Sequence, residues 1–181
     1  MKGIVFTEFQ EMIESNFGLE MYDKLVTTSN LESNGAYTTV GTYDHTELLQ
    51  MVVQLSQETD TPVPTLVKAF AHHFFTVLVR THGKMLANIT SSIELLANVE
   101  DYIHVEVRKL YPDAELPRFE FEKVAEDRWH VDYFSARPFA DLAEGLIEAA
   151  AKHFDDPLVI EREDKDVPDG YAARFVLSMS A

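Results

Sequence analysis

The chain has 181 residues, of which 46% are hydrophobic, and a formal net charge of -16. This length and composition predict a single domain over 1–181, or two closely joined lobes, around a large core. The excess of acidic residues repels phosphate groups and anionic lipid, so we expect neither nucleic acid nor a membrane surface as a partner.

The sequence contains no cysteine. This excludes disulfides, thiolate metal sites and a cysteine nucleophile, and any metal must be bound by His, Tyr, Met or carboxylates. An acidic residue, Glu8, comes too early for a signal peptide, and no apolar run approaches the roughly 18 residues of a membrane helix. We therefore expect a cytoplasmic protein.

Two helices are predicted at the beginning of the chain. Apolar residues recur at helical spacing over 4–16, and Gly18 is a suitable stop signal. A second helix is expected over about 19–29. The following segment, 30–43, reads as a loop that has room for a short strand piece at 37–40.

The next helix has a start signal of its own. Asp44 followed by Glu47 has the spacing of a capping box, with Asp in the Ser/Thr role. Thr61 and Pro62 mark a further helix, with Thr61 as N-cap and Pro62 at the first helical position. A long helix over 91–111 is then predicted, and its apolar stripe runs directly beside His104.

The last third of the chain reads mostly as strands. Apolar residues at every second position predict a hairpin that turns near Glu126 and Asp127. A helix from Pro138 to about Phe154 follows. Two further strands are expected at about 158–163 and 171–178.

The last two strands are separated by an acidic turn over 161–169. The whole pattern predicts an α+β fold, with a helical N-terminal subdomain over 1–60. The remainder, 61–181, is expected to be an α/β subdomain built around a small antiparallel sheet.

Three polar residues in the predicted second strand of the hairpin are spaced two apart. Because side chains alternate along an extended segment, Tyr133, Ser135 and Arg137 are expected to project to one side. The planar guanidinium binds a carboxylate through two parallel hydrogen bonds, and hydroxyls add further ones. The motif therefore predicts a carboxylate clamp.

His104 offers one imidazole that complements this clamp. Together they suggest haem, with iron on His104 and the propionates on Tyr133, Ser135 and Arg137. A haem-free module that binds a dicarboxylate or acyl ligand through the same clamp remains an alternative. His72 and His73 are unsuited to sharing a metal, because adjacent helical positions point about 100° apart.

Several segments, in order along the chain, carry a family resemblance. They resemble the H-NOX (haem nitric oxide/oxygen binding, HNOB) family, in particular its stand-alone bacterial members. The segments are the opening MKGIVFTEF, the run 104–112, the Tyr-x-Ser-x-Arg motif at 133–137, Gly145-Leu146-Ile147 and His153-Phe154.

The resemblance implies the H-NOX fold, with helices and a small sheet enclosing a non-covalent haem b. By the same resemblance His104 is the iron ligand, and Tyr133, Ser135 and Arg137 hold the propionates. Pro117 matches a proline that presses on the porphyrin and bends it. Leu146 matches a position near the proximal face of the haem.

The resemblance also predicts which gases bind. Leu142 stands where oxygen-binding members have a tyrosine that stabilises bound O₂, and Phe9 and Phe74 occupy two other pocket positions. None of these side chains donates a hydrogen bond, whereas NO binds ferrous haem without one. We therefore expect NO and CO to bind, and little or no O₂.

The expected role is a haem-based gas sensor and not an enzyme. The chain has no room for an output domain, so the resemblance implies signalling in trans to a histidine kinase or a diguanylate cyclase/phosphodiesterase. A haem enzyme of NO or peroxide chemistry is an alternative, but the apolar residues Leu142, Phe9 and Phe74 offer it no acid or base. Ala140 stands where many relatives begin a cysteine-rich zinc site, so zinc is not expected.

Overall fold

The computed structural model describes residues 1–180. Contacts within the chain divide it into two compact units, Met1–Phe74 and the residues from Phe75 onward. The boundary falls within helix α4 (Val63–His82). The sequence placed a boundary earlier, between 60 and 61, and that subdomain division stays a prediction.

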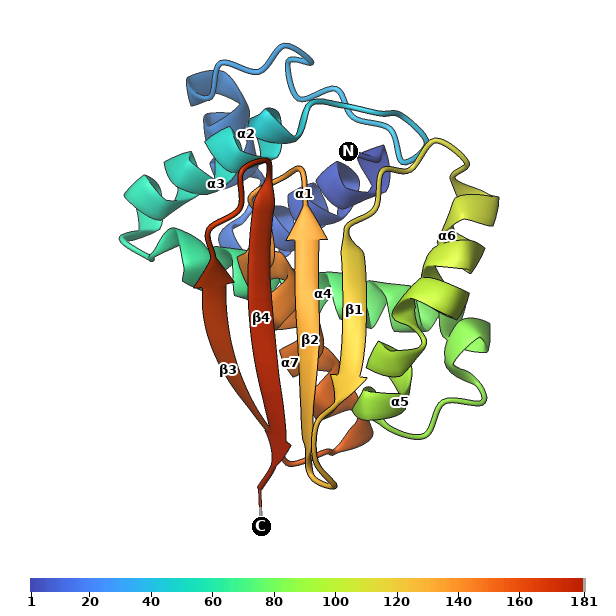
Figure 1. The fold of residues 1–181 in the computed structure, drawn as a ribbon. Helices are drawn as coiled ribbons and strands as arrows, with labels where there is room; N and C mark the ends of the chain where they lie inside the picture. Colours follow the sequence, from blue (N-terminus) through green and yellow to red (C-terminus); the bar gives the residue numbers. More distant parts are fainter. Residues whose placement is uncertain (181) are drawn as a thin grey trace. The chain divides into compact units, whose positions relative to one another are not determined.

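The first unit consists of α1 (Gly3–Phe17), α2 (Leu19–Thr28), α3 (His45–Thr59) and the first part of α4, drawn in blue to green in Figure 1. The predicted helices over 4–16 and 19–29 are confirmed. Gly18 separates them at a φ of 88°, which a residue without a Cβ adopts at little cost. The buried core of this unit includes Phe6, Phe9, Met12, Ile13, Leu25, Leu48, Met51 and Leu55.

The loop after α2 contains no strand among its described residues, so the predicted strand piece at 37–40 is wrong. The loop instead returns to the start of the chain, where Lys2 and Thr42 form an isolated antiparallel bridge. A Cβ on Gly3 would lie 1.8 Å from the carbonyl oxygen of Thr38. Only glycine therefore fits at this close approach of two backbone segments.

The start of α3 confirms one half of the predicted capping box. The Asp44 carboxylate accepts a hydrogen bond from the Thr46 backbone N–H at 2.8 Å. Glu47 does not reach back to the cap. Its buried carboxylate accepts hydrogen bonds from the Ser33 backbone N–H at 3.2 Å and from the Tyr37 hydroxyl at 2.6 Å, because a buried charge requires partners.

The second unit contains a four-stranded antiparallel sheet of order β1-β2-β4-β3. The predicted hairpin and the last two strands are confirmed. The third strand continues to Lys165, two residues beyond the predicted end and into the segment expected to be an acidic turn. The strands are β1 (Arg118–Lys123), β2 (Arg128–Ser135), β3 (Leu158–Lys165) and β4 (Tyr171–Met179), in yellow to red in Figure 1.

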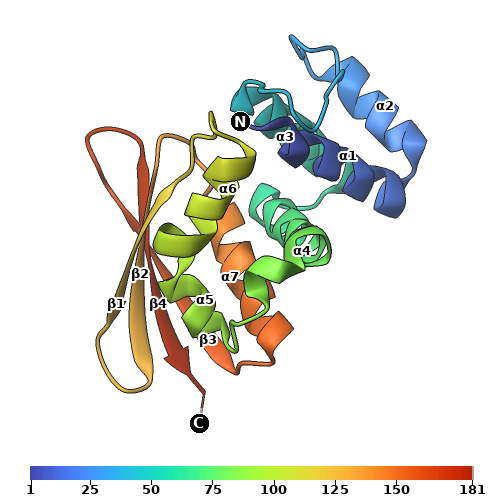
Figure 2. The ribbon, with the colours of Figure 1, turned by 90° about the vertical axis from the view of Figure 1, so that its right-hand side faces the viewer.

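Helices α5 (Ser92–Ala97), α6 (His104–Leu110) and α7 (Ala140–Phe154) lie on one side of this sheet (Figure 2). A short 3₁₀ helix, Gly83–Leu86, precedes them. Within residues 1–180, every helix is too short or too polar to span a bilayer. The core between sheet and helices is formed by Leu96, Trp129, Val131, Tyr133, Ala143, Ile147, Ala173, Phe175 and Leu177.

The long helix predicted over 91–111 is interrupted, so this prediction is wrong in part. A π-helical segment, Val99–Ile103, separates α5 from α6. The backbone N–H of Ile103 donates to the Asn98 carbonyl at 3.1 Å, which is the i to i−5 pattern of the wider π turn. The interruption makes His104 the first residue of α6, and α6 ends at Leu110, close to the expected Pro112.

Candidate functional site

His104 begins α6 and is buried, with 8% of its surface exposed. Its Nδ1 lies 3.0 Å from Oε1 of Glu100, one turn earlier in the π-helical segment. A carboxylate oxygen accepts, so the ring donates through Nδ1–H. This arrangement leaves Nε2 as the nitrogen with an available lone pair.

The electrostatic surroundings of His104 favour the neutral imidazole. Burial lowers the pKa of the ring from its ordinary value, and the Glu100 carboxylate opposes that shift without cancelling it. Neutral imidazole is the form that binds metals. The neutral form, with its lone pair on Nε2, is therefore favoured at His104, and this is the form that a metal ligand needs.

A line of three rings connects His104 to the polar motif. The centroids of His104 and Phe119 are 5.9 Å apart, and those of Phe119 and Tyr133 are 5.5 Å apart. Phe119 and Tyr133 are also paired residues of β1 and β2. The structure thus brings the predicted iron ligand and the predicted clamp to the same end of β1.

Tyr133 and Ser135 are neighbours on the same face of β2. Tyr133 is almost completely buried, and burial raises the pKa of its hydroxyl. A hydrogen bond from Ser135 opposes that rise in pKa, as does the positive charge of Arg137. Ser135 and Arg137 therefore both lie close enough to the Tyr133 hydroxyl to affect its pKa.

Arg137 joins the motif by a different route from the predicted one. β2 ends at Ser135, so strand alternation does not place Arg137. The chain turns here, and the Arg137 backbone N–H donates to the Ser135 hydroxyl oxygen at 3.0 Å. This local bond competes with strand continuation, and the turn that it stabilises carries the guanidinium to its position.

The Arg137 guanidinium already holds a carboxylate. It donates to the Glu115 backbone carbonyl at 3.0 Å and also to the Glu115 carboxylate. The Arg137 side chain is 16% exposed, whereas that of Glu115 is 81% exposed. The sequence does not mark Glu115 as a partner of Arg137, because a lone acidic residue in a loop has no recognisable pattern.

Pro117, Leu142 and Leu146 belong to the same unit as His104 and are half-buried. Pro117 stands two residues after Glu115 and directly before β1. Leu146 packs in an apolar cluster that also contains Ile103, the residue before His104. Leu142 lies one turn earlier than Leu146 on α7, so the two share a helix face.

Phe9 and Phe74 lie in the first unit, on α1 and α4. Phe70 connects them, with its ring centroid 5.4 Å from Phe9 and 5.6 Å from Phe74. These rings form one apolar aromatic group. A common pocket of Phe9 and Phe74 with Leu142 stays a prediction.

One histidine of the pair on α4, His73, lies close to a carboxylate of α1. His73 Nε2 lies 3.5 Å from Oε2 of Glu8, and both residues belong to the first unit. Both atoms are buried and lack a hydrogen bond of normal geometry among the described residues. Across residues 1–180, no three His, Asp or Glu side chains converge as ligands for a metal ion.

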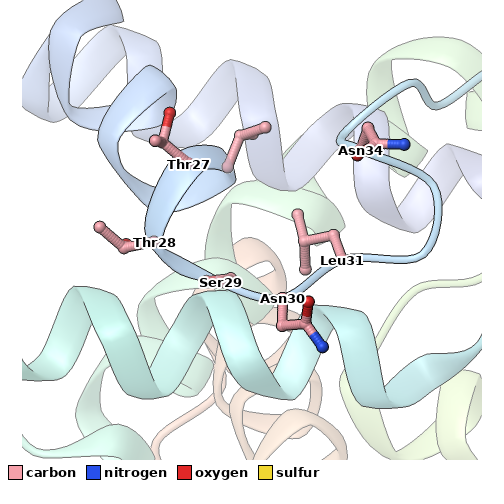
Figure 3. A pocket seen from close by; sticks show the side chains of 7 residues that line it. Thr27, Thr28, Ser29, Asn30, Leu31 and Asn34 are labelled. Carbon is pink, nitrogen blue, oxygen red and sulfur yellow. The ribbon is translucent and has the colours of Figure 1, made fainter.

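A polar hollow of about 430 Å³ lies at the end of α2 (Figure 3). None of the residues that line it is a predicted site residue. Figure 3 shows hydroxyl and amide side chains around it. Its lining residues are Val26, Thr27, Thr28, Ser29, Asn30, Leu31 and Asn34.

The fold and these residues agree with a family assignment made by comparison. The model of the Haem-NO-binding family (HNOB) matches residues 2–162. The chain therefore belongs to this family, as the sequence segments predicted. No curated protein matches the chain.

Solved H-NOX structures resemble the whole chain and confirm the H-NOX fold. The Fe(II) unliganded H-NOX protein from K. algicida is 42% identical, with a TM-score of 0.92 over 100% of this chain and 97% of its own. The IWP-051-bound H-NOX from Shewanella woodyi in the Fe(II)CO state is 39% identical, with a TM-score of 0.84 over 99% and 95%. The S. oneidensis H-NOX protein in the Fe(II)NO state is 25% identical, with a TM-score of 0.90 over 100% of both chains.

Proposed function

We propose that this protein is a haem-based sensor of nitric oxide, with haem b bound non-covalently through Nε2 of His104. One observation carries the proposal. A buried imidazole whose Nδ1 is already hydrogen-bonded lies at the same end of β1 as an arginine that pairs with a carboxylate. These are the two attachment points that a haem requires, one for iron and one for propionates.

The polar motif fits the acidic groups of a haem. Burying two propionates costs several kcal/mol per ion unless each is paired. We propose that Arg137, with the hydroxyls of Tyr133 and Ser135, provides this pairing. The Glu115 carboxylate is mostly exposed, so a propionate can replace it on the guanidinium at little cost in desolvation.

The iron of a bound haem supplies the site at which a gas binds. If His104 is the one protein ligand of the iron, a coordination position would remain open for a gas. We propose that Phe9, Phe74 and Leu142 form the wall of that position and that Pro117 and Leu146 contact the porphyrin. An apolar wall gives O₂ no hydrogen bond, so we propose binding of NO and CO with little or no O₂.

The ligation states of two relatives support this choice of gases. The Shewanella woodyi relative is described with CO, and the S. oneidensis relative with NO. Neither relative indicates which protein this chain signals to. We propose that NO weakens the attachment of His104, that α6 then moves, and that the altered surface signals in trans to a histidine kinase or a cyclic-di-GMP enzyme.

Absorption spectroscopy of the purified protein tests the proposal. We expect a Soret band in the expressed protein, or after addition of hemin to the apoprotein, and NO-dependent changes that report release of His104. A preparation that stays colourless with hemin would favour the haem-free carboxylate-binding alternative. Turnover of peroxide or NO by the loaded protein would favour the haem enzyme.

A further inference from the structure

Glu100 takes part in two contacts, and the proposed function uses only the one with His104. Its Oε1 accepts from His104 Nδ1–H at 3.0 Å and from the Phe119 backbone N–H at 2.8 Å. One atom thus joins the π-helical segment before α6 to the first residues of β1. Its side chain is 31% exposed, so this double acceptor lies at the boundary of the core.

The contact with Phe119 follows from the position of β1. This strand is at the edge of the sheet, and alternate N–H groups of an edge strand point away from the sheet. An unpaired N–H that is partly buried costs free energy. Glu100 supplies the acceptor for the N–H of Phe119, which stands two residues after Pro117.

The contact with His104 depends on the π-helical segment. The Ile103 N–H bonds to Asn98 five residues back, so this turn is wider than an α turn. Such single-turn π segments are frequently found at functional sites. Here the wide turn places the Glu100 carboxylate against the ring of His104, the residue that follows the π-helical segment.

We propose that Glu100 is a positioning residue that orients the His104 ring for iron and links the iron–histidine bond to the β1 edge. This inference rests on the proposed haem function. A carboxylate on Nδ1–H fixes the tautomer, holds the ring in place and raises the basicity of Nε2. Because the same oxygen holds Phe119, a movement of His104 is transmitted to the backbone beside Pro117.

The chain offers a matched set of variants. Glu100→Gln removes the charge and retains the side-chain length, whereas Glu100→Asp keeps the charge and withdraws it by one methylene. The control is Glu106→Gln, which makes the same chemical change two residues beyond His104. Glu106 pairs instead with Lys109 on the exposed side of α6.

Resonance Raman spectroscopy of the ferrous protein measures the iron–histidine stretch directly. We expect a lower stretching frequency in both Glu100 variants and about tenfold weaker hemin binding, since loss of an outer partner of a metal ligand typically costs 10–100-fold. Glu106→Gln should retain the wild-type frequency and affinity. A wild-type frequency in Glu100→Gln overturns the proposal. A wild-type frequency in Glu100→Asp overturns the claim that Glu100 acts through a direct hydrogen bond to His104.

A second measurement needs no haem. Hydrogen exchange of the Phe119 amide, followed by NMR in the apoprotein, should be faster in both Glu100 variants and unchanged in Glu106→Gln. Equal protection in all four proteins would contradict the link to β1. A wild-type protein that never binds hemin would instead refute the proposed function, so the two failures are distinguishable.

Discussion

The two faces of strand β2 use polar residues for different purposes. On one face, Asp132 accepts hydrogen bonds from Arg174 at 2.6 and 2.9 Å and from Lys165 at 2.6 Å. On the other, Tyr133 and Ser135 lie next to Arg137, whose carboxylate partner is mostly exposed. Charges that satisfy one another within the sheet stabilise the fold, whereas an arginine with a replaceable partner can exchange it for a ligand.

The largest expected effect concerns His104. We expect His104→Ala to abolish the Soret band of the purified protein, because no other described imidazole has the same buried, carboxylate-bonded position. Asp132→Asn should keep full haem occupancy. The measurement is the ratio of Soret to protein absorbance, and haem retained at wild-type level without His104 would remove the basis of the assignment.

Arg137 is expected to have the next largest effect. A charge-assisted hydrogen bond contributes about 1.5–3 kcal/mol, so Arg137→Ala should weaken hemin binding by roughly 10–100-fold. Arg174→Ala, the matched change on the opposite face, should leave hemin affinity unchanged. Fluorescence quenching of the apoprotein by added hemin gives both affinities, and equal losses in the two variants would show that the faces do not differ.

Substitution of Asp132 should change the free energy of unfolding and leave haem binding unchanged. The Arg174 guanidinium, with help from Lys165, lowers the pKa of this carboxyl to about 2. Asp132→Asn should therefore lower the free energy of unfolding by about 1 kcal/mol at neutral pH, after allowance for solvent screening.

The sign of the pH dependence follows from the lowered pKa of Asp132. The stabilisation is complete above the ordinary pKa of 3.8 and is lost as the pH falls toward about 2. Urea unfolding of wild type and Asp132→Asn should thus differ by a constant amount at neutral pH, and by less in this acid range. A difference that grows as the pH falls would contradict the ion-pair account.

The smallest effect is expected at Glu115. Glu115→Gln removes a mostly exposed partner of Arg137, and such pairs contribute only about 0–1 kcal/mol to stability. Hemin should bind equally well or slightly more tightly, because a competing carboxylate is lost. Hemin titration of the variant measures this, and a severalfold loss of affinity would mean that Glu115 orients Arg137 for its ligand.

Local patterns in the sequence predicted most of the secondary structure. The period of apolar residues identified α1 and the hairpin of β1 and β2, because these elements bury one regular face. The continuous helix over 91–111 failed at Val99–Ile103, a segment in which Glu100 has a partner, Phe119, on the distant strand β1. The capping box failed at Glu47 for the same reason, because its partners Ser33 and Tyr37 come from a folded loop.

The amino-acid order alone determined the family, the haem-ligand candidate His104 and the polar motif at 133–137, because each can be recognised from short runs of consecutive residues. Only the tertiary structure decided what those side chains contact. Glu100 meets Phe119, and Glu115 meets Arg137, across 19 and 22 residues of chain. Such pairings arise when partly buried donors and charges find their partners on folding, and no local period records them.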